Sequence, residues 1–107
     1  MLLHNSDTIA AIATAPGIGA IGVIRLSGPD AVTIADKIFK GKNLTEQPTH
    51  TLHFGHIVDP NTDEMIDEVV VSLFLGNKSY TGENTVEISG HGSPYILQRI
   101  LETAITN

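Results

Sequence analysis

The sequence contains no cysteine, and aromatic residues make up only 5% of it. Without cysteine, these 107 residues cannot form a disulfide, a thiolate metal site or a cysteine nucleophile. No apolar run is long enough to span a bilayer. The first residues also lack the basic region and extended apolar stretch of a signal peptide. We therefore expect a cytoplasmic protein that has no membrane partner.

Basic residues are scarce as well. There are 6 lysines and arginines against 12 acidic residues, which gives a formal net charge of −6. Contacts to phosphate depend on clustered basic side chains. Here the bases are scattered except in residues 37–42, where they are typical of an ordinary helix end. This segment is therefore not expected to be what holds a nucleic acid.

The sequence offers little support for either of two nucleotide-binding motifs. The G-x-x-x-x-G-K-[ST] pattern of a P-loop is absent from the chain. Residues 17–22 do match G-x-G-x-x-G, but they run into the strand-like Val-Ile-Arg-Leu of residues 23–26 instead of opening a helix. We interpret these glycines as part of a tight turn between strands, where glycine readily supplies a positive φ.

The five histidines do not suggest a metal site. His53 and His56 are three residues apart on a predicted strand, so their side chains point to opposite faces. With no cysteine and no helical histidine pair, we expect no metal ligands. His91 lies between two glycines, and we interpret it as a turn or helix-entry residue, not as a catalytic base.

Hydrophobic periodicity predicts a single domain, residues 1–107, with an α+β fold. The expected order is β-β-α-β-β-β-α, giving a mixed, largely antiparallel five-stranded sheet covered by two helices. A turn at residues 59–63 joins two of the strands into a hairpin. The expected strands are residues 8–14, 22–26, 51–59, 65–75 and 85–89; one helix runs from Ser27 to near Gly41, and another starts at Ser93 and Pro94. The last helix runs to the final residue without a polar tail, so we expect the chain to be a piece of something longer.

Residues 79–92 are the most informative part of the sequence: a glycine-bearing turn, a short strand and a Gly-His-Gly hinge into a helix. Glu87 shares the polar face of this strand with Thr85 and Ser89, so exposure to water alone explains it; a carboxylate there could equally grip a ligand that offers paired donors. Arg25 interrupts an apolar strand, where a buried cation needs a partner or a ligand. Alternatively, Arg25 lies at the end of the strand with its own guanidinium group in water. Arg25 and Glu87 could also pair with each other.

Residues 7–17, 19–28 and 79–92 closely resemble the MnmE (TrmE) family of tRNA modification GTPases. The three segments occur in the family's order and at its spacing, so the resemblance covers nearly the whole chain. There are two departures. Asn84 stands where the family usually has aspartate, and Ser93 stands where it usually has a second glycine after the histidine.

The resemblance implies a folate-binding and dimerisation domain, related in fold to the tetrahydrofolate domains of one-carbon enzymes. Its ligand would be 5-formyltetrahydrofolate, with contacts at Arg25 and Glu87 and at a lysine beyond Asn107. A pterin offers an amino group and a ring N–H side by side, and the carboxylate of Glu87 can accept both. Arg25 could meet a carbonyl, formyl oxygen or carboxylate of the same ligand. We interpret Glu83, beside Gly82, as a structural turn residue and not as a ligand contact.

The family resemblance also describes a longer enzyme. A helical domain and a GTPase domain, with its GTP, magnesium and potassium, would lie outside these residues. With the flavoprotein MnmG, the whole homodimeric enzyme would add an aminomethyl-type group to C5 of the wobble uridine of certain tRNAs. This chain alone would have no catalytic residue.

Two rival hypotheses remain. The chain could be a purely structural dimerisation module in which Arg25 and Glu87 form an ion pair without significant folate binding. It could also be a free-standing folate-dependent enzyme, but the sequence offers no candidate nucleophile or metal site for one.

Overall fold

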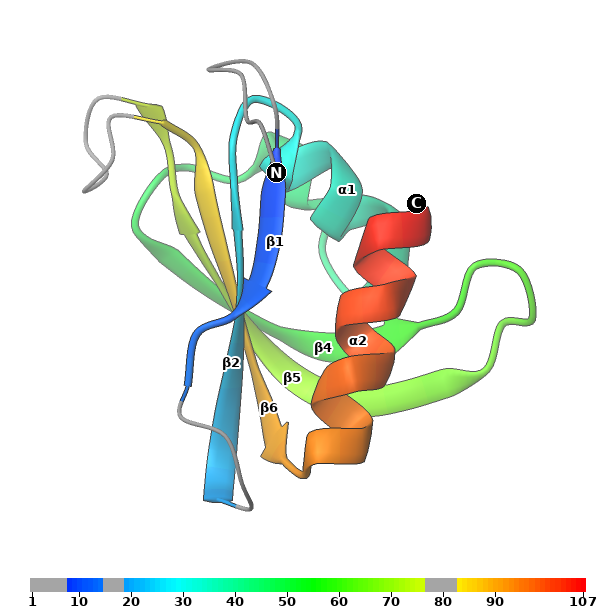
Figure 1. Ribbon diagram of the computed structural model, residues 1–107. Helices are drawn as coiled ribbons and strands as arrows, with labels where there is room; N and C mark the ends of the chain where they lie inside the picture. The colour runs from blue at the N-terminus through cyan, green and yellow to red at the C-terminus, as the bar shows by residue number, and fades with distance from the viewer. Residues whose placement is uncertain (1–7, 15–18, 77–82) are drawn as a thin grey trace.

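The computed structural model describes residues 8–14, 19–76 and 83–107 (Figure 1). The start of the chain, part of the expected turn before the second strand, and the predicted glycine-bearing turn at residues 79–82 lie outside the described residues. The rest forms one sheet with two helices on the same side (Figure 1). This arrangement confirms the α+β class.

The sheet has six strands in the spatial order β1-β2-β6-β5-β4-β3. Its strands are β1 (Ile9–Ile12), β2 (Gly19–Ser27), β3 (Phe39–Lys40), β4 (Thr51–Val58), β5 (Met65–Phe74) and β6 (Thr85–Gly92). The helices are α1 (Ala31–Ile38), α2 (Pro94–Thr106) and the short 3-10 helix η1 (Leu44–Glu46). All neighbouring strands are antiparallel. The predicted β4–β5 hairpin is confirmed, whereas the prediction of a five-stranded, mixed sheet was wrong.

The additional strand, β3, lies where the first helix was expected to continue. Helix α1 ends at Ile38, and Phe39 takes up extended dihedral angles of φ −106° and ψ 129°. Phe39 then pairs with Ile57 of β4. Its ring packs over Gly55, where an added Cβ would lie 2.5 Å from the ring. The strand preference of an aromatic residue, and the space left by this glycine, therefore end the helix three residues before Gly41.

The start of α1 and the end of β6 also differ from the prediction. Ser27 is the last residue of β2, so it does not cap the helix. Strand β6 continues past Ser89 to Gly92, because β2 is long enough to pair with it through Ile21↔His91 and Gly19↔Gly92. The Gly-His-Gly segment is therefore strand and not a hinge. Helix α2 begins as expected, with Ser93 as N-cap and a proline in the first turn.

The hydrophobic core lies between the sheet and the two helices. Alternate residues of β2, β5 and β6 point toward the helices, as the period of a strand requires. Leu97 of α2 sits directly over Gly22 of β2, where an added Cβ would lie 2.5 Å from Leu97 Cδ1. The core includes Ile24, Leu26, Ala35, Ile38, Leu44, Ile57, Val71, Leu73, Val86, Ile88, Leu97 and Ile100.

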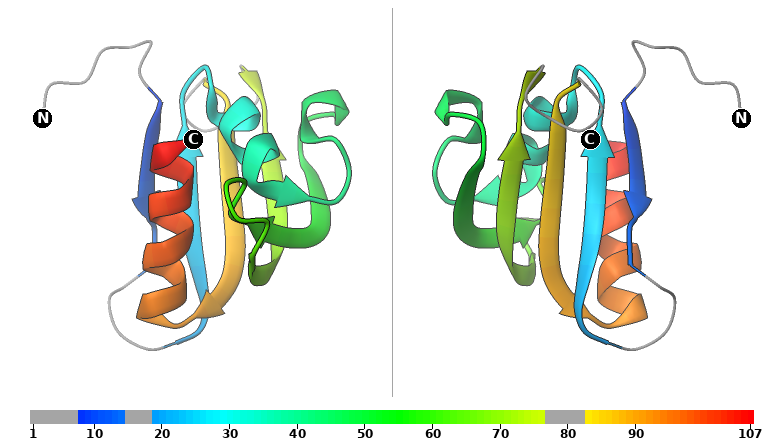
Figure 2. Two further views of the ribbon diagram at one scale, coloured as in Figure 1. Left: turned by 90° about the vertical axis from the view of Figure 1, so that its right-hand side faces the viewer. Right: turned by 90° about the vertical axis from the view of Figure 1, so that its left-hand side faces the viewer.

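The opposite face of the sheet is not covered by any described helix, as the right-hand view of Figure 2 shows. Residues directly opposite in an antiparallel pair share a face, so the register defines this open face. Its side chains belong to Ile9, Ala11, Ile21, Val23, Arg25, Leu52, Phe54, His56, Glu68, Val70, Ser72, Glu87, Ser89 and His91. Several large apolar side chains are exposed here. Among the described residues, no helix is both long and apolar enough to cross a membrane.

Candidate ligand-binding site

Arg25 and Glu87 lie directly opposite each other on β2 and β6. The Nε and NH2 groups of Arg25 donate to Glu87 Oε2 at 2.9 and 2.6 Å. Both side chains are on the open face; 51% of the arginine side chain and 27% of the glutamate side chain are exposed. The two predicted site residues are therefore brought together, and they form an ion pair with each other.

The ion pair leaves part of each side chain available. Both hydrogen bonds end on Oε2, and no described residue donates to Oε1 of Glu87. Arg25 NH1 likewise donates to no described residue. Ser72 of β5 lies on the other side of Glu87 in the sheet. The pair thus presents one carboxylate oxygen and one guanidinium nitrogen to a molecule on the open face.

A partly exposed ion pair of this kind contributes little to folding, typically about 0–1 kcal/mol. Solvent screens its attraction, and both side chains lose conformational freedom in forming it. The Arg25–Glu87 contact can therefore be exchanged for contacts to a ligand at small cost to the fold. That property suits a binding site better than a structural brace.

Two other predictions concern Glu83 and the histidines. Glu83 lies at a bend two residues before β6 begins, and Gly82 beside it is outside the described residues. His53 is buried on the helix-covered face, while His56 lies on the open face, so the prediction that they point to opposite sides is confirmed. In the part of the chain that the structure describes, no three His, Asp or Glu side chains are grouped to hold a metal ion.

The sequence reasoning missed a contact between Asp67 of β5 and His91 of β6. Asp67 Oδ1 lies 2.5 Å from His91 Nδ1, and Asp67 Oδ2 accepts a 2.8 Å hydrogen bond from the backbone N–H of His91. Only 8% of the aspartate side chain is exposed. One signal was present in the sequence: two successive acids, Asp67 and Glu68, interrupt a strongly apolar strand, so one of them must point toward the covered face.

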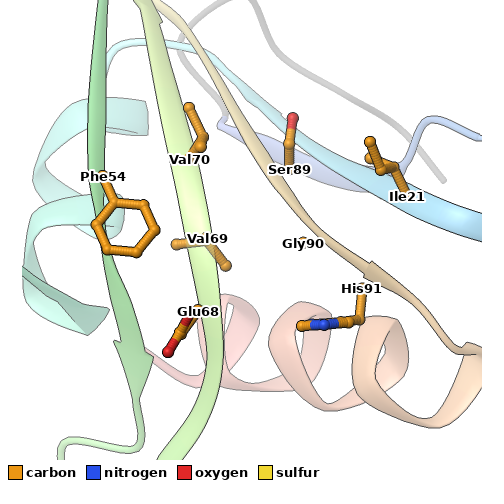
Figure 3. A pocket seen from close by; sticks show the side chains of 8 residues that line it. All are labelled: Ile21, Phe54, Glu68, Val69, Val70, Ser89, Gly90 and His91. Atoms are coloured by element: carbon orange, nitrogen blue, oxygen red, sulfur yellow. The ribbon is translucent and has the colours of Figure 1, made fainter.

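A shallow pocket of about 270 Å³ opens beside His91 on the open face (Figure 3). Its apolar walls come from Ile21 of β2, Phe54 of β4 and Val70 of β5, and its polar groups from Glu68, Ser89 and His91. Figure 3 shows the His91 ring reaching from β6 toward β5.

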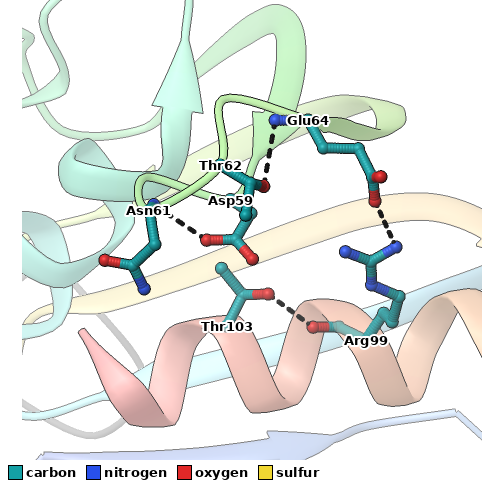
Figure 4. Close-up of polar contacts among 6 residues, drawn as sticks. All are labelled: Asp59, Asn61, Thr62, Glu64, Arg99 and Thr103. Atoms are coloured by element: carbon teal, nitrogen blue, oxygen red, sulfur yellow. Dashed lines mark hydrogen bonds and ion pairs between the residues drawn. The ribbon is translucent and has the colours of Figure 1, made fainter.

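A second polar cluster ties the turn between β4 and β5 to α2 (Figure 4). Arg99 NH1 donates to Glu64 Oε1 at 2.6 Å, and this hydrogen bond raises the pKa of the Arg99 guanidinium above its usual value. Within the turn, Asp59 Oδ1 accepts from the backbone N–H of Asn61 at 2.9 Å. The Arg99–Glu64 contact holds the turn against the helix and the Asp59–Asn61 contact shapes the turn itself, so we assign the cluster a structural role.

Comparison with known proteins identifies the family. Residues 8–107 match the model of the family described as GTP-binding protein TrmE N-terminus. The chain belongs to this family. It is 54% identical over 107 residues to the tRNA modification GTPase MnmE of Ligilactobacillus salivarius, covering 100% of this chain and 23% of that protein. The MnmE proteins of Flavobacterium johnsoniae and Streptococcus pyogenes are 56% and 52% identical over 101 and 99 residues, each covering 92% of this chain and 21% and 22% of the relative.

The family resemblance of the sequence is thereby confirmed. This TrmE N-terminal domain spans less than a quarter of the length of the curated relatives it matches. In the domain, the segment that includes Glu87 forms β6, at the centre of the sheet. The assignment of Arg25 and Glu87 as ligand contacts stays a prediction.

Proposed function

We propose that this domain binds 5-formyltetrahydrofolate on the open face of its sheet, through Arg25 and Glu87. One observation supports the proposal: these two side chains contact each other on an exposed surface, and no described residue donates a hydrogen bond to Glu87 Oε1. An arginine and a glutamate in contact can each satisfy one half of a ligand that carries both donors and acceptors.

The chemistry of a pterin matches this pair. Its amino group and adjacent ring N–H form two parallel donors, which a carboxylate accepts as charge-assisted hydrogen bonds. Glu87 would receive both, Oε1 being open already and Oε2 being released as Arg25 turns away. The guanidinium of Arg25 would then donate to a carbonyl, formyl oxygen or carboxylate of the same ligand.

We also propose that the domain self-associates through the open face. Leu52 and Phe54 of β4 expose 70% and 67% of their surface there, and Ile9 of β1 is also exposed. A soluble protein rarely leaves such a set of apolar side chains uncovered unless a partner covers them. A second copy of the same face would bury them in a symmetric dimer.

The relatives, which are named tRNA modification GTPases and are more than four times as long as this chain, support a place for the domain in a longer protein. We propose that this chain serves such an enzyme in the cytoplasm. The GTPase domain with its GTP, magnesium and potassium, and the contacts to MnmG and to tRNA, would lie outside these residues. The whole enzyme would add an aminomethyl-type group to C5 of the wobble uridine, and this domain would supply the folate and the dimer contact without a catalytic residue.

One rival has a specific observation in its favour. Arg25 and Glu87 already satisfy each other in an ion pair. A purely structural dimerisation module would need nothing more from them, and it would show no significant affinity for folate.

Isothermal titration calorimetry with 5-formyltetrahydrofolate separates the two functions. We expect Glu87→Gln to weaken binding by about tenfold or more, because a charged acceptor of two hydrogen bonds is lost. Arg25→Ala should also weaken it. Glu64→Gln is the matched control, since it removes an ion pair of the same 2.6 Å length between the β4–β5 turn and Arg99 of α2, on the helix side of the sheet. No binding by the wild type would favour the structural module, whereas equal affinities of wild type and Glu87→Gln would overturn the assignment of Glu87 to the folate site.

A further inference from the structure

Ser72 of β5 places a hydroxyl group beside the Arg25–Glu87 pair. It interrupts an otherwise apolar run of the strand, Val-Val-Val-Ser-Leu-Phe. In the register of the sheet, Ser72 lies directly opposite Glu87 of β6 on one side and Leu52 of β4 on the other. Glu87 therefore lies between two polar neighbours on the open face, Arg25 on β2 and Ser72 on β5.

The hydroxyl of Ser72 is nearly buried and has no partner in the described part of the chain. Only 9% of the residue is exposed, and no described group forms a hydrogen bond with its Oγ. A polar group that loses most of its water without gaining a partner costs free energy. The apolar side chain of Leu52 cannot supply a hydrogen bond. The neighbour across the sheet that can accept one is the carboxylate of Glu87.

The spacing of the two strands allows this contact. Directly opposite residues of an antiparallel pair have Cβ atoms about 4.5–5.5 Å apart, and the long glutamate side chain can direct its carboxylate across that gap. In the structure the carboxylate is engaged with β2 instead, because both hydrogen bonds from Arg25 go to Oε2. Rotation of the glutamate side chain would bring the carboxylate to Ser72 without a change in the backbone.

A serine donor does not compete with a ligand for Glu87. An ionised carboxylate has about four acceptor positions on its two oxygens. Two parallel donors of a ligand ring take one position on each oxygen, which leaves room for the O–H of Ser72. The donor that Glu87 loses when Arg25 departs can therefore be replaced by one from the neighbouring strand.

We propose that Ser72 is a positioning residue for Glu87. When Arg25 turns away from the carboxylate, the Ser72 hydroxyl donates a hydrogen bond to it and holds it in place for the ligand. Arg25 and Ser72 are thus alternative donors to one carboxylate. The role in ligand binding rests on the proposed folate site, whereas the exchange of donors at Glu87 does not.

The exchange of donors can be tested without a ligand, by urea unfolding of the 107-residue chain. Ser72→Ala by itself should leave the unfolding midpoint unchanged or raise it, because it removes a nearly buried hydroxyl that has no partner. In an Arg25→Ala background, Ser72→Ala should lower the midpoint, because there Ser72 has become the donor to Glu87. An effect whose sign depends on Arg25 identifies the two residues as alternative partners.

Ser89→Ala is the matched control. It removes the same hydroxyl group from the same face of the sheet, two residues along β6 and about 7 Å from Glu87. Across the sheet Ser89 lies opposite Val23 and Val70, and not opposite Glu87. We expect the effect of Ser89→Ala on the midpoint to be the same in the wild type and in the Arg25→Ala background.

Calorimetry with 5-formyltetrahydrofolate tests the role of Ser72 in binding. Ser72→Ala should weaken the affinity by about three- to tenfold, because one hydrogen bond to the carboxylate that holds the ligand is lost. Ser72→Thr keeps the hydroxyl on a residue that suits a strand, so it should retain the affinity of the wild type. Ser89→Ala should retain it as well.

The two experiments separate this inference from the folate site itself. A Ser72→Ala effect of the same sign and size with and without Arg25 would overturn the exchange of donors. Equal folate affinities of Ser72→Ala and a wild type that binds would overturn the positioning role. If the wild type does not bind 5-formyltetrahydrofolate, the folate site is wrong, and the urea midpoints still decide whether Ser72 and Arg25 alternate at Glu87.

Discussion

Arg25 of β2 and Glu87 of β6 face each other across the centre of the sheet, and two nitrogens of the arginine share a single carboxylate oxygen, Oε2, at 2.9 and 2.6 Å. This geometry is asymmetric: both hydrogen bonds from Arg25 go to Oε2, and no described residue donates to Oε1. A pair built only for stability would be expected to use both oxygens in the parallel, bidentate arrangement.

The energetic coupling between Arg25 and Glu87 should therefore be small. A double-mutant cycle with Arg25→Ala, Glu87→Ala and the double variant should give a coupling free energy of about 1 kcal/mol or less in urea unfolding, because both side chains are partly exposed. A coupling of several kcal/mol would show that the pair is a structural brace and would favour the dimerisation module without folate.

The close packing of α2 on β2 should make residue 22 intolerant of any side chain. Gly22→Ala places a Cβ within 2.5 Å of Leu97 Cδ1, and we expect it to destabilise the fold by about 1–3 kcal/mol through overpacking. The measurement is the midpoint of urea unfolding. Adding Leu97→Ala to Gly22→Ala should cost less than the sum of the two single changes; strict additivity would show that the two residues do not press on each other.

Self-association should depend on the open face and not on the outer surface of α2. Leu52→Glu places a charge on the open face, and we expect it to yield a monomer in multi-angle light scattering. Ile105→Glu is a control of similar exposure, 66% against 70%, on helix α2. Dissociation by Ile105→Glu but not by Leu52→Glu would assign the dimer contact to the helix side, and a wild type that is monomeric at high concentration would rule out self-association.

The chain alone should not hold tRNA. Its formal net charge is −6, and affinity for nucleic acid rests largely on neutralised phosphates. Fluorescence anisotropy with labelled tRNA at about 0.15 M salt should show no binding in the micromolar range. Micromolar binding that weakens steeply as salt is added would reveal a basic surface that the scattered lysines and arginines do not suggest.

The parts of the fold that the sequence predicted well are those with strong local periodicity. Alternating residues predicted the β4–β5 hairpin, and the apolar face of α2 together with Ser93 and Pro94 marked its start. Strand β3 was missed because Phe39 continues the apolar face of the preceding helix, and only its pairing with Ile57 makes it a strand. Local pattern cannot reveal a pairing partner that is 18 residues away.

The candidate site likewise has residues that the local sequence reveals and residues that depend on a distant partner. Arg25 and Glu87 stand out in the sequence because charges interrupt apolar strands, and the register was needed to place them opposite each other. The role of Asp67 was missed, since the residue that it contacts, His91, is 24 residues away and on another strand. Gly90 was misread as part of a hinge for a related reason: the group that requires a glycine there is the Asp67 carboxylate, which the local sequence does not show.

The most direct measurement of the central claim is the NMR spectrum of the ¹⁵N-labelled chain during titration with 5-formyltetrahydrofolate. The account predicts that the largest changes occur at the Arg25 Nε–H and at the backbone amides of Arg25, Glu87 and their neighbours on β2 and β6, with the Nε–H signal moving as the arginine leaves Glu87 Oε2. Saturating ligand that leaves the Arg25 Nε–H unmoved, or that shifts only residues of α1 and α2 on the covered face, would contradict it.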